Sequence, residues 1–376
     1  MAPTFALIAG GGTAGHVLPG LAVARALVAS GHPPESIHWV GSRAGLEGRL
    51  VPEAGFGITT MPGRGIERRL SWANVRSGLG LAWASAESLA VVARRRPAVV
   101  LALGGYASVP CAAAAAALGV PIVVCEQNAV PGAANRLVAR AARAAAVSFP
   151  GTDLPRAELT GNPVRPEVLA VDRTRDRQKA RAALGLPAER LVVAVFGGSL
   201  GARRINVAVV GALDGWRARP ELAVRHVVGR RDWSAVTAAL ATVGLAELPE
   251  DGLVYQPVEY EDRMDLLLAA ADLAVCRAGA TSVAELAAVG LPSVLVPLPG
   301  APGDHQTANA RYLADAGGAV LVPDDELDGG RLAGVVDDLL TDPLRLEAMS
   351  RDAVRQSRRD AADRVAAVVE KHARRV

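Results

Sequence analysis

The feature that most constrains the fold of this chain is a strand followed by a glycine-rich turn and a helix, an order that occurs twice. The first copy is Phe5–Ala9, followed by Gly10–Gly15 and a helical stretch that stops at Gly31. The second is Leu191–Phe196, followed by Gly197–Gly201. Glycines let a backbone approach a ligand closely, and the N-terminus of the following helix presents unpaired N–H groups. Both turns are therefore candidate phosphate- or substrate-binding loops.

Strand-like apolar runs alternate with longer Ala/Leu-rich helical patterns along the whole chain, which is typical of βαβ units and parallel sheets. In the first half we expect strands near Phe5–Ala9, Ile37–Gly41, Ile58–Met61, Val99–Leu103, Ile122–Cys125 and Ala145–Ser148. In the second half we expect them near Leu191–Phe196, Ala223–Val228, Leu253–Gln256, Leu273–Cys276, Ser293–Val296 and Ala319–Val322. The fold class is therefore α/β.

The length of 376 residues fits two domains better than one. We place a hinge at Asn162–Pro166, before a segment rich in Pro, Asp and Arg. The predicted domains are residues 1–165 and 166–352. A charged, helix-like tail over about 353–376 is expected to pack back on the first domain.

Composition excludes several classes of protein. The formal charge of +3, without a long basic tract, does not suggest nucleic-acid binding. Three widely spaced cysteines argue against a disulfide framework or a zinc site. We find no leader-like N-terminus and no apolar run long enough to span a membrane. We therefore expect a soluble protein of the cytoplasm.

The first glycine turn matches a dinucleotide-binding pattern, but the second strand ends in Gly41-Ser42-Arg43, without the acid that a nicotinamide site usually has. His16 stands where the helix begins, and the helix dipole disfavours a charged imidazole there. A neutral His16 could serve as a base or as a hydrogen-bond donor in a cleft. It could equally be a capping or packing residue.

The second glycine turn is followed by Arg203 and Arg204 in the first turn of a helix, where their charge opposes the dipole. A bound anion such as a diphosphate would relieve this conflict. The alternative is a tight turn with solvated arginines. Further along, Glu285 could accept both hydroxyls of a ribose, although Ser282 and Glu285 also have the spacing of a capping box. Asp304–Asn309 suits sugar hydroxyls, or marks a helix start capped by Asp304.

Six motifs, taken in order, resemble the MurG family of bacterial peptidoglycan transferases in glycosyltransferase family 28. They are Gly11–Gly20, Gly104-Gly105-Tyr106, Glu126-Gln127-Asn128, Thr160–Arg165, Gly197–Arg203 and Cys276–Glu285. The resemblance covers roughly Phe5 to Val322. It implies a GT-B fold, with two Rossmann-like parallel-sheet domains facing a cleft. It also implies inverting transfer of N-acetylglucosamine from UDP-N-acetylglucosamine to the C4 hydroxyl of undecaprenyl-diphospho-muramoyl-pentapeptide (lipid I), giving lipid II.

The same resemblance implies which residues bind the substrates. The donor would lie mainly on the second domain and the lipid acceptor on the first. Donor contacts would come from Thr13, Gly15, Asn128, Arg165, Gly198, Ser199, Tyr260, Ala280, Glu285, His305 and Gln306. Acceptor contacts would come from Gly12, Thr13, His16, Gly105 and Tyr106. In this context Glu285 is expected to hold the ribose rather than to act only as a cap.

For the catalytic base we rank His16 first, because an imidazole serves near neutral pH, and Glu126 second, because its carboxyl would need burial to raise its pKa. No D-x-D motif is present, so we expect no metal and no cofactor. The chain departs from the family pattern at three positions, where Ala14, Cys125 and His305 replace a common Gly, His and Gln. Ala14 requires a negative φ at its position for the turn to survive.

A lipid-linked acceptor implies contact with a bilayer. Residues 61–96 contain seven arginines and two glutamates, with Trp72 and Trp83 among them. Such a stretch suits an anionic leaflet, although an ordinary amphipathic helix would have the same pattern. We expect a peripheral protein on the cytoplasmic face of the cell membrane. Rival functions are another UDP-sugar enzyme, such as a diacylglycerol glycosyltransferase or a 2-epimerase, or a non-catalytic nucleotide-binding module. The Gly11–Gly20 run argues against the two rival enzymes.

Overall fold

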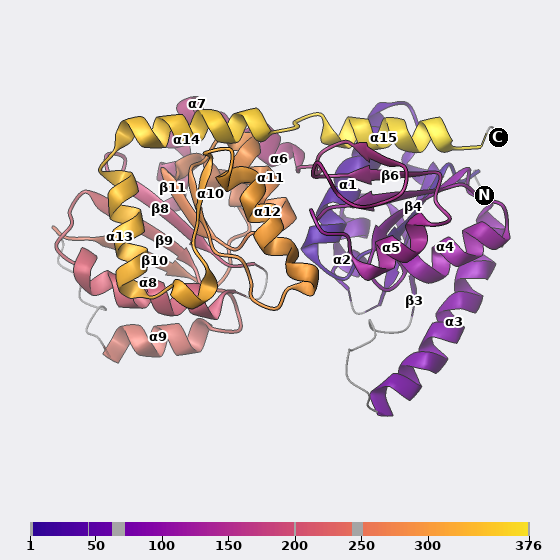
Figure 1. Ribbon diagram of the computed structural model, residues 1–376, viewed down its shortest axis with the longest axis horizontal. Coiled ribbons are helices and arrows are strands. Elements are labelled where there is room, and N and C mark those ends of the chain that lie inside the picture. The colour runs from indigo at the N-terminus through magenta and orange to yellow at the C-terminus, as the bar shows by residue number, and fades with distance from the viewer. Residues whose placement is uncertain (1–2, 44, 62–71, 199–200, 243–250, 375–376) are drawn as a thin grey trace. The chain divides into compact units, whose positions relative to one another are not determined.

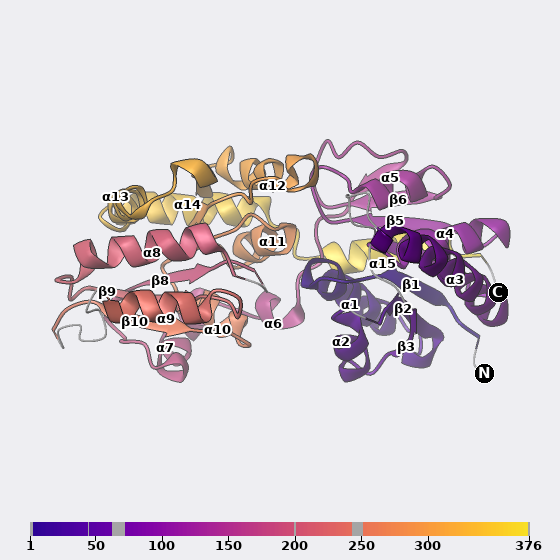
Figure 2. The same cartoon turned by 90° about the horizontal axis from the view of Figure 1, so that it is seen from below.

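The computed structural model describes residues 3–43, 45–61, 72–198, 201–242 and 251–374, with side chains for all of these except 72–82. The chain forms two compact units. The N-terminal unit comprises Met1–Arg165 and Arg358–Val376, and the C-terminal unit comprises Pro166–Ser357. Each unit contains one parallel sheet covered by helices on both faces (Figures 1 and 2).

The sheet of the N-terminal unit has the order β3-β2-β1-β4-β5-β6-β7. Its strands are β1 (Ala6–Gly10), β2 (Ile37–Ser42), β3 (Gly57–Met61), β4 (Val99–Gly104), β5 (Ile122–Glu126), β6 (Ala144–Val147) and β7 (Ala157–Leu159). Its helices are α1 (Ala14–Ala29), α2 (Glu47–Glu53), α3 (Trp72–Arg95), α4 (Ser108–Ala117), α5 (Ala133–Ala139) and α15 (Ala361–His372). The strand order reverses between β1 and β4, which is where open parallel sheets bind ligands.

Both faces of this sheet are apolar, because β1 alternates its side chains between two cores. Ala6 and Ile8 pack with α1, α2 and α15, whereas Leu7 and Ala9 pack with α3, α4 and α5. Burial on both faces explains why the strands are continuous apolar runs rather than alternating ones.

The C-terminal tail returns to the N-terminal unit. Helix α14 (Pro343–Gln356) ends before α15, and α15 packs against α1 (Figure 1). A side-chain contact joins α15 to the turn after α1, where His32 Nε2 lies 3.1 Å from Glu370 Oε1. The His32 ring also stacks on Phe5, with ring centroids 3.6 Å apart. The tail is therefore two helices, and the break between them is where the chain passes from one unit to the other.

The sheet of the C-terminal unit has the order β10-β9-β8-β11-β12-β13, which reverses between β8 and β11. Its strands are β8 (Leu191–Phe196), β9 (Leu222–Val227), β10 (Val254–Val258), β11 (Leu273–Cys276), β12 (Ser293–Leu295) and β13 (Ala319–Leu321). Its other helices are α6 (Pro166–Leu169), α7 (Arg173–Leu184), α8 (Arg203–Trp216), α9 (Trp233–Thr242), α10 (Met264–Ala270), α11 (Ala280–Val289), α12 (His305–Ala314) and α13 (Gly329–Leu340).

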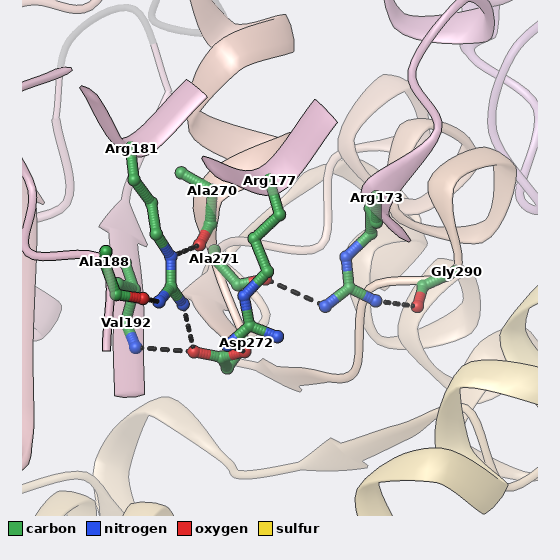
Figure 3. A network of polar contacts seen from close by, with 9 residues as sticks. All are labelled: Arg173, Arg177, Arg181, Ala188, Val192, Ala270, Ala271, Asp272 and Gly290. Atoms are coloured by element: carbon green, nitrogen blue, oxygen red, sulfur yellow. Dashed lines mark hydrogen bonds and ion pairs between the residues drawn. The ribbon is translucent and has the colours of Figure 1, made fainter. Parts of the chain in front are cut away.

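Three arginines of α7 attach this helix to the amino ends of β8 and β11 (Figure 3). Arg177 and Arg181 both pair with Asp272, at 2.6 and 2.7 Å, and Asp272 also accepts the N–H of Val192. Arg173 donates to the carbonyls of Ala271 and Gly290, and burial lowers its pKa to about 10. The Arg-rich segment after the hinge is thus a structural part of the C-terminal unit, at the sheet edge opposite the glycine turn.

The α/β prediction with two parallel sheets is confirmed, and each of the twelve expected strands is present within two residues of its predicted bounds. The strand β7 was not predicted. It is a three-residue edge strand with the polar Glu158 at its centre, so it lacks the apolar run on which the other predictions depended.

Candidate functional sites in the two units

The first glycine turn leaves the carboxyl end of β1, at the point where the strand order reverses. The indole N–H of Trp39 donates to the Gly10 carbonyl at 2.8 Å. The turn also packs tightly on the loop after β4, because a Cβ added to Gly105 would lie 2.7 Å from the Gly11 carbonyl oxygen. A Cβ added to Gly12 would meet no atom of the described residues within 4 Å, so in this part of the chain the turn has an open side at Gly12.

His16 lies in the first turn of α1, above the end of β4. Its Nδ1 is 3.2 Å from the hydroxyl oxygen of Thr13. Thr13 is the N-cap residue of α1, yet its side chain caps no backbone N–H. A Cβ added to Gly104 would lie 3.3 Å from His16 Nε2, so the imidazole and the β4 loop are in close proximity. The first turn thus presents an imidazole at the carboxyl edge of the sheet.

Ala14, where the family commonly has glycine, causes no strain. It is the first residue of α1, and the non-glycine residues with positive φ in the described part of the chain are Arg96, Arg156 and Asp304. Gly15 follows it, and a Cβ there would lie 3.8 Å from the Thr13 hydroxyl oxygen. Ala14 therefore does not have the positive φ that would require glycine at its position.

Glu126, at the end of β5, is only 2% exposed and accepts hydrogen bonds on both carboxylate oxygens. Oε1 accepts the backbone N–H and the side-chain amide of Asn128, at 2.9 and 3.3 Å. Oε2 accepts from the Gly132 N–H at 3.0 Å and from the Asn135 amide at 2.9 Å. Glu126 thereby organises the loop that carries Asn128.

Two residues near the carboxyl ends of β5 and β4, Cys125 and Tyr106, have raised pKa values. Cys125 replaces a common histidine of the family, and burial, with the nearby Glu126 carboxylate, raises its thiol pKa to about 12. A thiol with so high a pKa stays protonated, so Cys125 does not act as a base in place of the histidine. Burial also raises the pKa of Tyr106, whose buried hydroxyl has no hydrogen-bond partner among the described residues.

The second glycine turn has the same place in the C-terminal unit, at the carboxyl end of β8. The Gly201 N–H donates to the Gly198 carbonyl at 2.8 Å, and Gly201 has a φ of +83°. A Cβ at Gly201 would lie 2.3 Å from the Val228 carbonyl oxygen, which only glycine avoids. The predicted donor contact Ser199 lies outside the described residues.

The two arginines after this turn are exposed in the first turn of α8, as expected. Arg204 donates to the backbone carbonyl of Asp325 at 2.9 Å. The adjacent Asp324 accepts from the largely buried Arg277 at 2.5 Å. Arg277 also donates to the carbonyls of Val296 and Pro297, so it ties the ends of β11, β12 and β13 together.

Glu285 is 6% exposed in α11. The capping-box interpretation of Ser282 and Glu285 is wrong, because the N-cap of α11 is Gly279 and the helix begins at Ala280. Ser282 is therefore inside the helix, and Glu285 lies more than one turn from its start. Its carboxylate is close enough to the end of β11 to raise the pKa of Cys276, after the larger effect of burial.

Local hydrogen bonds to the preceding loop hold the side chains of the first two residues of α12. His305 Nδ1 donates to the Pro302 carbonyl at 2.9 Å, and Gln306 accepts the Leu298 N–H at 3.0 Å. Asp304 is at the N-cap position, but its side chain caps no backbone N–H and instead accepts from the Thr307 hydroxyl. Asn309 joins this helix to the turn after β11 by donating to the Ala278 carbonyl.

The predicted donor contact Tyr260 lies just after β10. Tyr260 is 45% exposed, and the Arg230 guanidinium lies 5.2 Å from the centre of its ring. The Glu261 side chain is held by Arg225, whose Nε and Nη2 both donate to Oε2, at 2.9 and 2.6 Å. Arg165 is the last residue of the N-terminal unit before α6.

Three buried polar groups at these edges were not predicted from the sequence. Glu47 accepts the N–H of Gly12, and Asn135 donates to Glu126. In the C-terminal unit, Asn206 of α8 donates to the Val228 carbonyl beside the second glycine turn. Each is a polar residue in or next to a run of small or apolar residues. Such an isolated polar residue is the sequence signal by which these three could have been predicted.

Among the residues that the structure describes, no three His, Cys, Asp or Glu side chains form a group that could hold a metal ion. No helix in the described ranges is long and apolar enough to cross a bilayer. Of the tryptophans expected at a membrane surface, Trp83 of α3 is described and is 66% exposed. The basic residues before α3, including Arg68 and Arg69, lie outside the described residues, as do the side chains of residues 72–82.

Comparisons with known proteins agree with the division into two units. The family model of the glycosyltransferase family 28 N-terminal domain matches residues 6–147, and that of the C-terminal domain matches residues 192–365. A Nocardioides protein named UDP-N-acetylglucosamine--N-acetylmuramyl-(pentapeptide) pyrophosphoryl-undecaprenol N-acetylglucosamine transferase is 45% identical over 363 residues, which is 96% of each chain. The crystal structure of Acinetobacter baumannii MurG superposes with a TM-score of 0.76 at 28% identity, covering 98% of this chain and all of that one.

A more distant structure, the glycosyltransferase of kitacinnamycin, has a TM-score of 0.69 at 19% identity and covers 99% of this chain and all of that one. At that identity the likeness concerns the fold alone.

Proposed function

Because this chain belongs to the MurG family within glycosyltransferase family 28, we propose that it transfers N-acetylglucosamine from UDP-N-acetylglucosamine to the C4 hydroxyl of the muramoyl sugar of lipid I, giving lipid II for peptidoglycan synthesis. Its two Rossmann-like units are those of a GT-B hexosyltransferase. The observation that carries the proposal is that the relatives match over nearly their full length, including both glycine turns.

The C-terminal unit is the proposed donor-binding unit. The main chain of the second glycine turn, with Gly198 and Ser199, would hold the diphosphate at the start of α8, where the dipole favours an anion. Glu285 would accept the ribose hydroxyls, and Ala280, His305 and Gln306 would line the glucosamine pocket. Tyr260 would flank the uracil with the face that Arg230 does not cover. Thr13, Gly15, Asn128 and Arg165 would complete the donor contacts.

The N-terminal unit is the proposed acceptor-binding unit. Thr13, His16, Gly105 and Tyr106 lie along one sheet edge with the open side of Gly12. The Gly12 N–H donates to Glu47, so this amide serves the turn itself, and the acceptor diphosphate would approach Gly12 from its open side.

The proposed reaction is a single displacement with inversion at the sugar carbon. The acceptor O4 attacks C1 of N-acetylglucosamine, the C1–O bond to the β-phosphate breaks, and UDP leaves with the electron pair. His16 Nε2 would take the hydroxyl proton. Glu126 is a weaker candidate, because amide and backbone N–H donors already occupy both of its carboxylate oxygens. Arg165 and main-chain N–H groups would stabilise the charge on the departing diphosphate.

We further propose that no metal ion is essential, since the sequence has no D-x-D motif to hold one against a diphosphate. Transfer should then continue in EDTA. A loss of activity in EDTA that Mg²⁺ restores would contradict this part of the proposal.

For localisation, we propose peripheral binding to the cytoplasmic face of the membrane through α3 and the basic segment before it. The exposed Trp83 supports this assignment, because an indole suits the interface of a bilayer. In liposome flotation with anionic lipid, Trp83→Ser should bind less than the wild type. Leu344→Ser, at an exposed apolar residue of the C-terminal unit, is the matched control. Equal flotation of all three proteins would contradict the assignment.

The deciding experiment measures UDP release from UDP-N-acetylglucosamine with and without lipid I. Release that depends on lipid I supports the proposal. Release without an acceptor would indicate an epimerase or a hydrolase, and no release would favour a nucleotide-binding module without catalysis.

A further inference from the structure

Glu47 is the most deeply enclosed carboxylate beside the first glycine turn. It is 0% exposed and is the first residue of α2. Its Oε2 accepts the Gly12 N–H at 2.7 Å, and its Oε1 accepts the Ser42 N–H at 2.7 Å. One side chain therefore joins the first glycine turn to the end of β2 by two short bonds to a carboxylate, which is the strong kind of hydrogen bond.

Three glycines from different segments form the space that this carboxylate fills. A Cβ added to Gly11 would lie 2.3 Å from Glu47 Cδ, one added to Gly41 would lie 2.3 Å from Cγ, and one added to Gly45 would lie 2.1 Å from Oε2. No side chain larger than hydrogen fits at these positions while Glu47 stays in place. The turn, β2 and the following loop each have a glycine where a single carboxylate occupies the space that a side chain would need.

The consequence for His16 follows along the chain. Gly12 directly precedes Thr13, whose hydroxyl lies 3.2 Å from His16 Nδ1. Trp39 holds the Gly10 carbonyl at the other end of the same turn. Glu47 and Trp39 together hold the turn at both ends, and Glu47 is the one that reaches the residue before the N-cap of α1.

We propose that Glu47 is a positioning residue, which holds the first glycine turn so that Thr13 and His16 meet the acceptor in a productive geometry. This inference rests on the acceptor role proposed above for the N-terminal unit. Glu47 touches neither substrate in this scheme and acts only through the Gly12 amide.

The test compares Glu47→Gln with Glu53→Gln, which makes the same change at an exposed position of the same helix. A glutamine at position 47 would turn its NH₂ group toward one of two buried N–H donors, so one of the two bonds is lost. We expect kcat of lipid I-dependent transfer to fall 10- to 100-fold, with the Kd for UDP, whose proposed site is in the C-terminal unit, unchanged. Glu53→Gln should match the wild type in both.

A second readout does not need the reaction. In protein labelled at histidine with ¹⁵N, Glu47→Gln should shift the ring nitrogens of His16 and leave those of His226 unchanged. If Glu47→Gln does not fold, Glu47→Asp, which keeps the charge but is one methylene shorter, should show the same two effects to a smaller degree. A folded Glu47→Gln with wild-type kcat and unshifted His16 nitrogens would overturn the inference. If the wild-type chain shows no UDP release that depends on lipid I, the proposed function is wrong. The chemical shifts of the His16 ring nitrogens would still test the positioning role of Glu47.

Discussion

The hydroxyl oxygen of Thr13 lies 3.2 Å from Nδ1 of His16, across the first turn of α1. This contact bears on which ring nitrogen can act as a base. If Nδ1–H donates to Thr13, the basic lone pair is on Nε2, the atom that faces Gly104 at the carboxyl edge of the sheet. If the hydroxyl donates to Nδ1, Nε2 holds the proton and cannot accept one. The proposed catalysis requires the first arrangement.

Replacing His16 by alanine should therefore reduce kcat by about 10²- to 10⁴-fold, the usual contribution of a general base. KM for the donor should change little. Steady-state UDP release with donor and acceptor both saturating measures this. Thr13→Val should cause a smaller loss, because it removes the partner of the imidazole but not the imidazole. Near-normal turnover of His16→Ala would move the role of base elsewhere.

Replacing Glu285 by alanine should weaken donor binding. Two hydrogen bonds between a carboxylate and ribose hydroxyls contribute about 1.5–3 kcal/mol each, so KM for UDP-N-acetylglucosamine should rise at least about 100-fold. The KM for lipid I should stay within a factor of two or so of the wild type. Glu347→Ala, at an exposed carboxylate of the same unit, is the control. An unchanged donor KM in Glu285→Ala would remove the ribose contact.

Replacing Asp272 by alanine should destabilise the C-terminal unit but leave its affinity for UDP unchanged. The change leaves the buried Arg181 guanidinium without its charged partner, which costs about 3–5 kcal/mol. The Kd for UDP, measured well below the melting temperature, should not change, since Asp272 and Val192 lie at the amino ends of β11 and β8, whereas the glycine turn follows the carboxyl end of β8. Asp176→Ala, which removes an exposed partner of Arg175, should have little effect on either quantity.

His226 makes the folded chain sensitive to acid. Burial lowers its pKa from 6.5 to about 4, and it lies between the Tyr255 hydroxyl at 2.8 Å and Asn206 Oδ1 at 3.0 Å. Between pH 6.5 and 4 the unfolded chain binds a proton that the folded chain excludes. The free energy of unfolding therefore falls as the pH falls through this window.

The measurement is urea unfolding of the wild type and of His226→Gln at pH 6.5 and pH 5. The wild type should lose about 2 kcal/mol more than the variant over that interval. Burial and the charges of Arg95 and Arg94 also lower the pKa of His38 to about 4. That histidine is present in both proteins, so its contribution cancels. Equal losses in the two proteins would contradict the assignment to His226.

Much of the fold could be predicted because it depends on local patterns. Burial on both faces of each sheet makes the central strands continuous apolar runs, and these identified every strand except the short edge strand β7. The glycine turns were equally visible, because a positive φ or a close backbone approach restricts the residue type at one position. The assignment to a sugar-nucleotide transferase followed from the order of six such motifs along the chain.

The sequence by itself thus determined two parallel-sheet units, the two glycine turns and the place of His16 at a helix start. Only the tertiary structure decided that Glu285 is not part of a capping box, because the start of α11 depends on where β11 ends. It also decided that Glu126 accepts four hydrogen bonds and that Glu47 occupies a space made by Gly11, Gly41 and Gly45. These contacts join residues from separate loops at one sheet edge, and no local pattern along the chain specifies which loops meet.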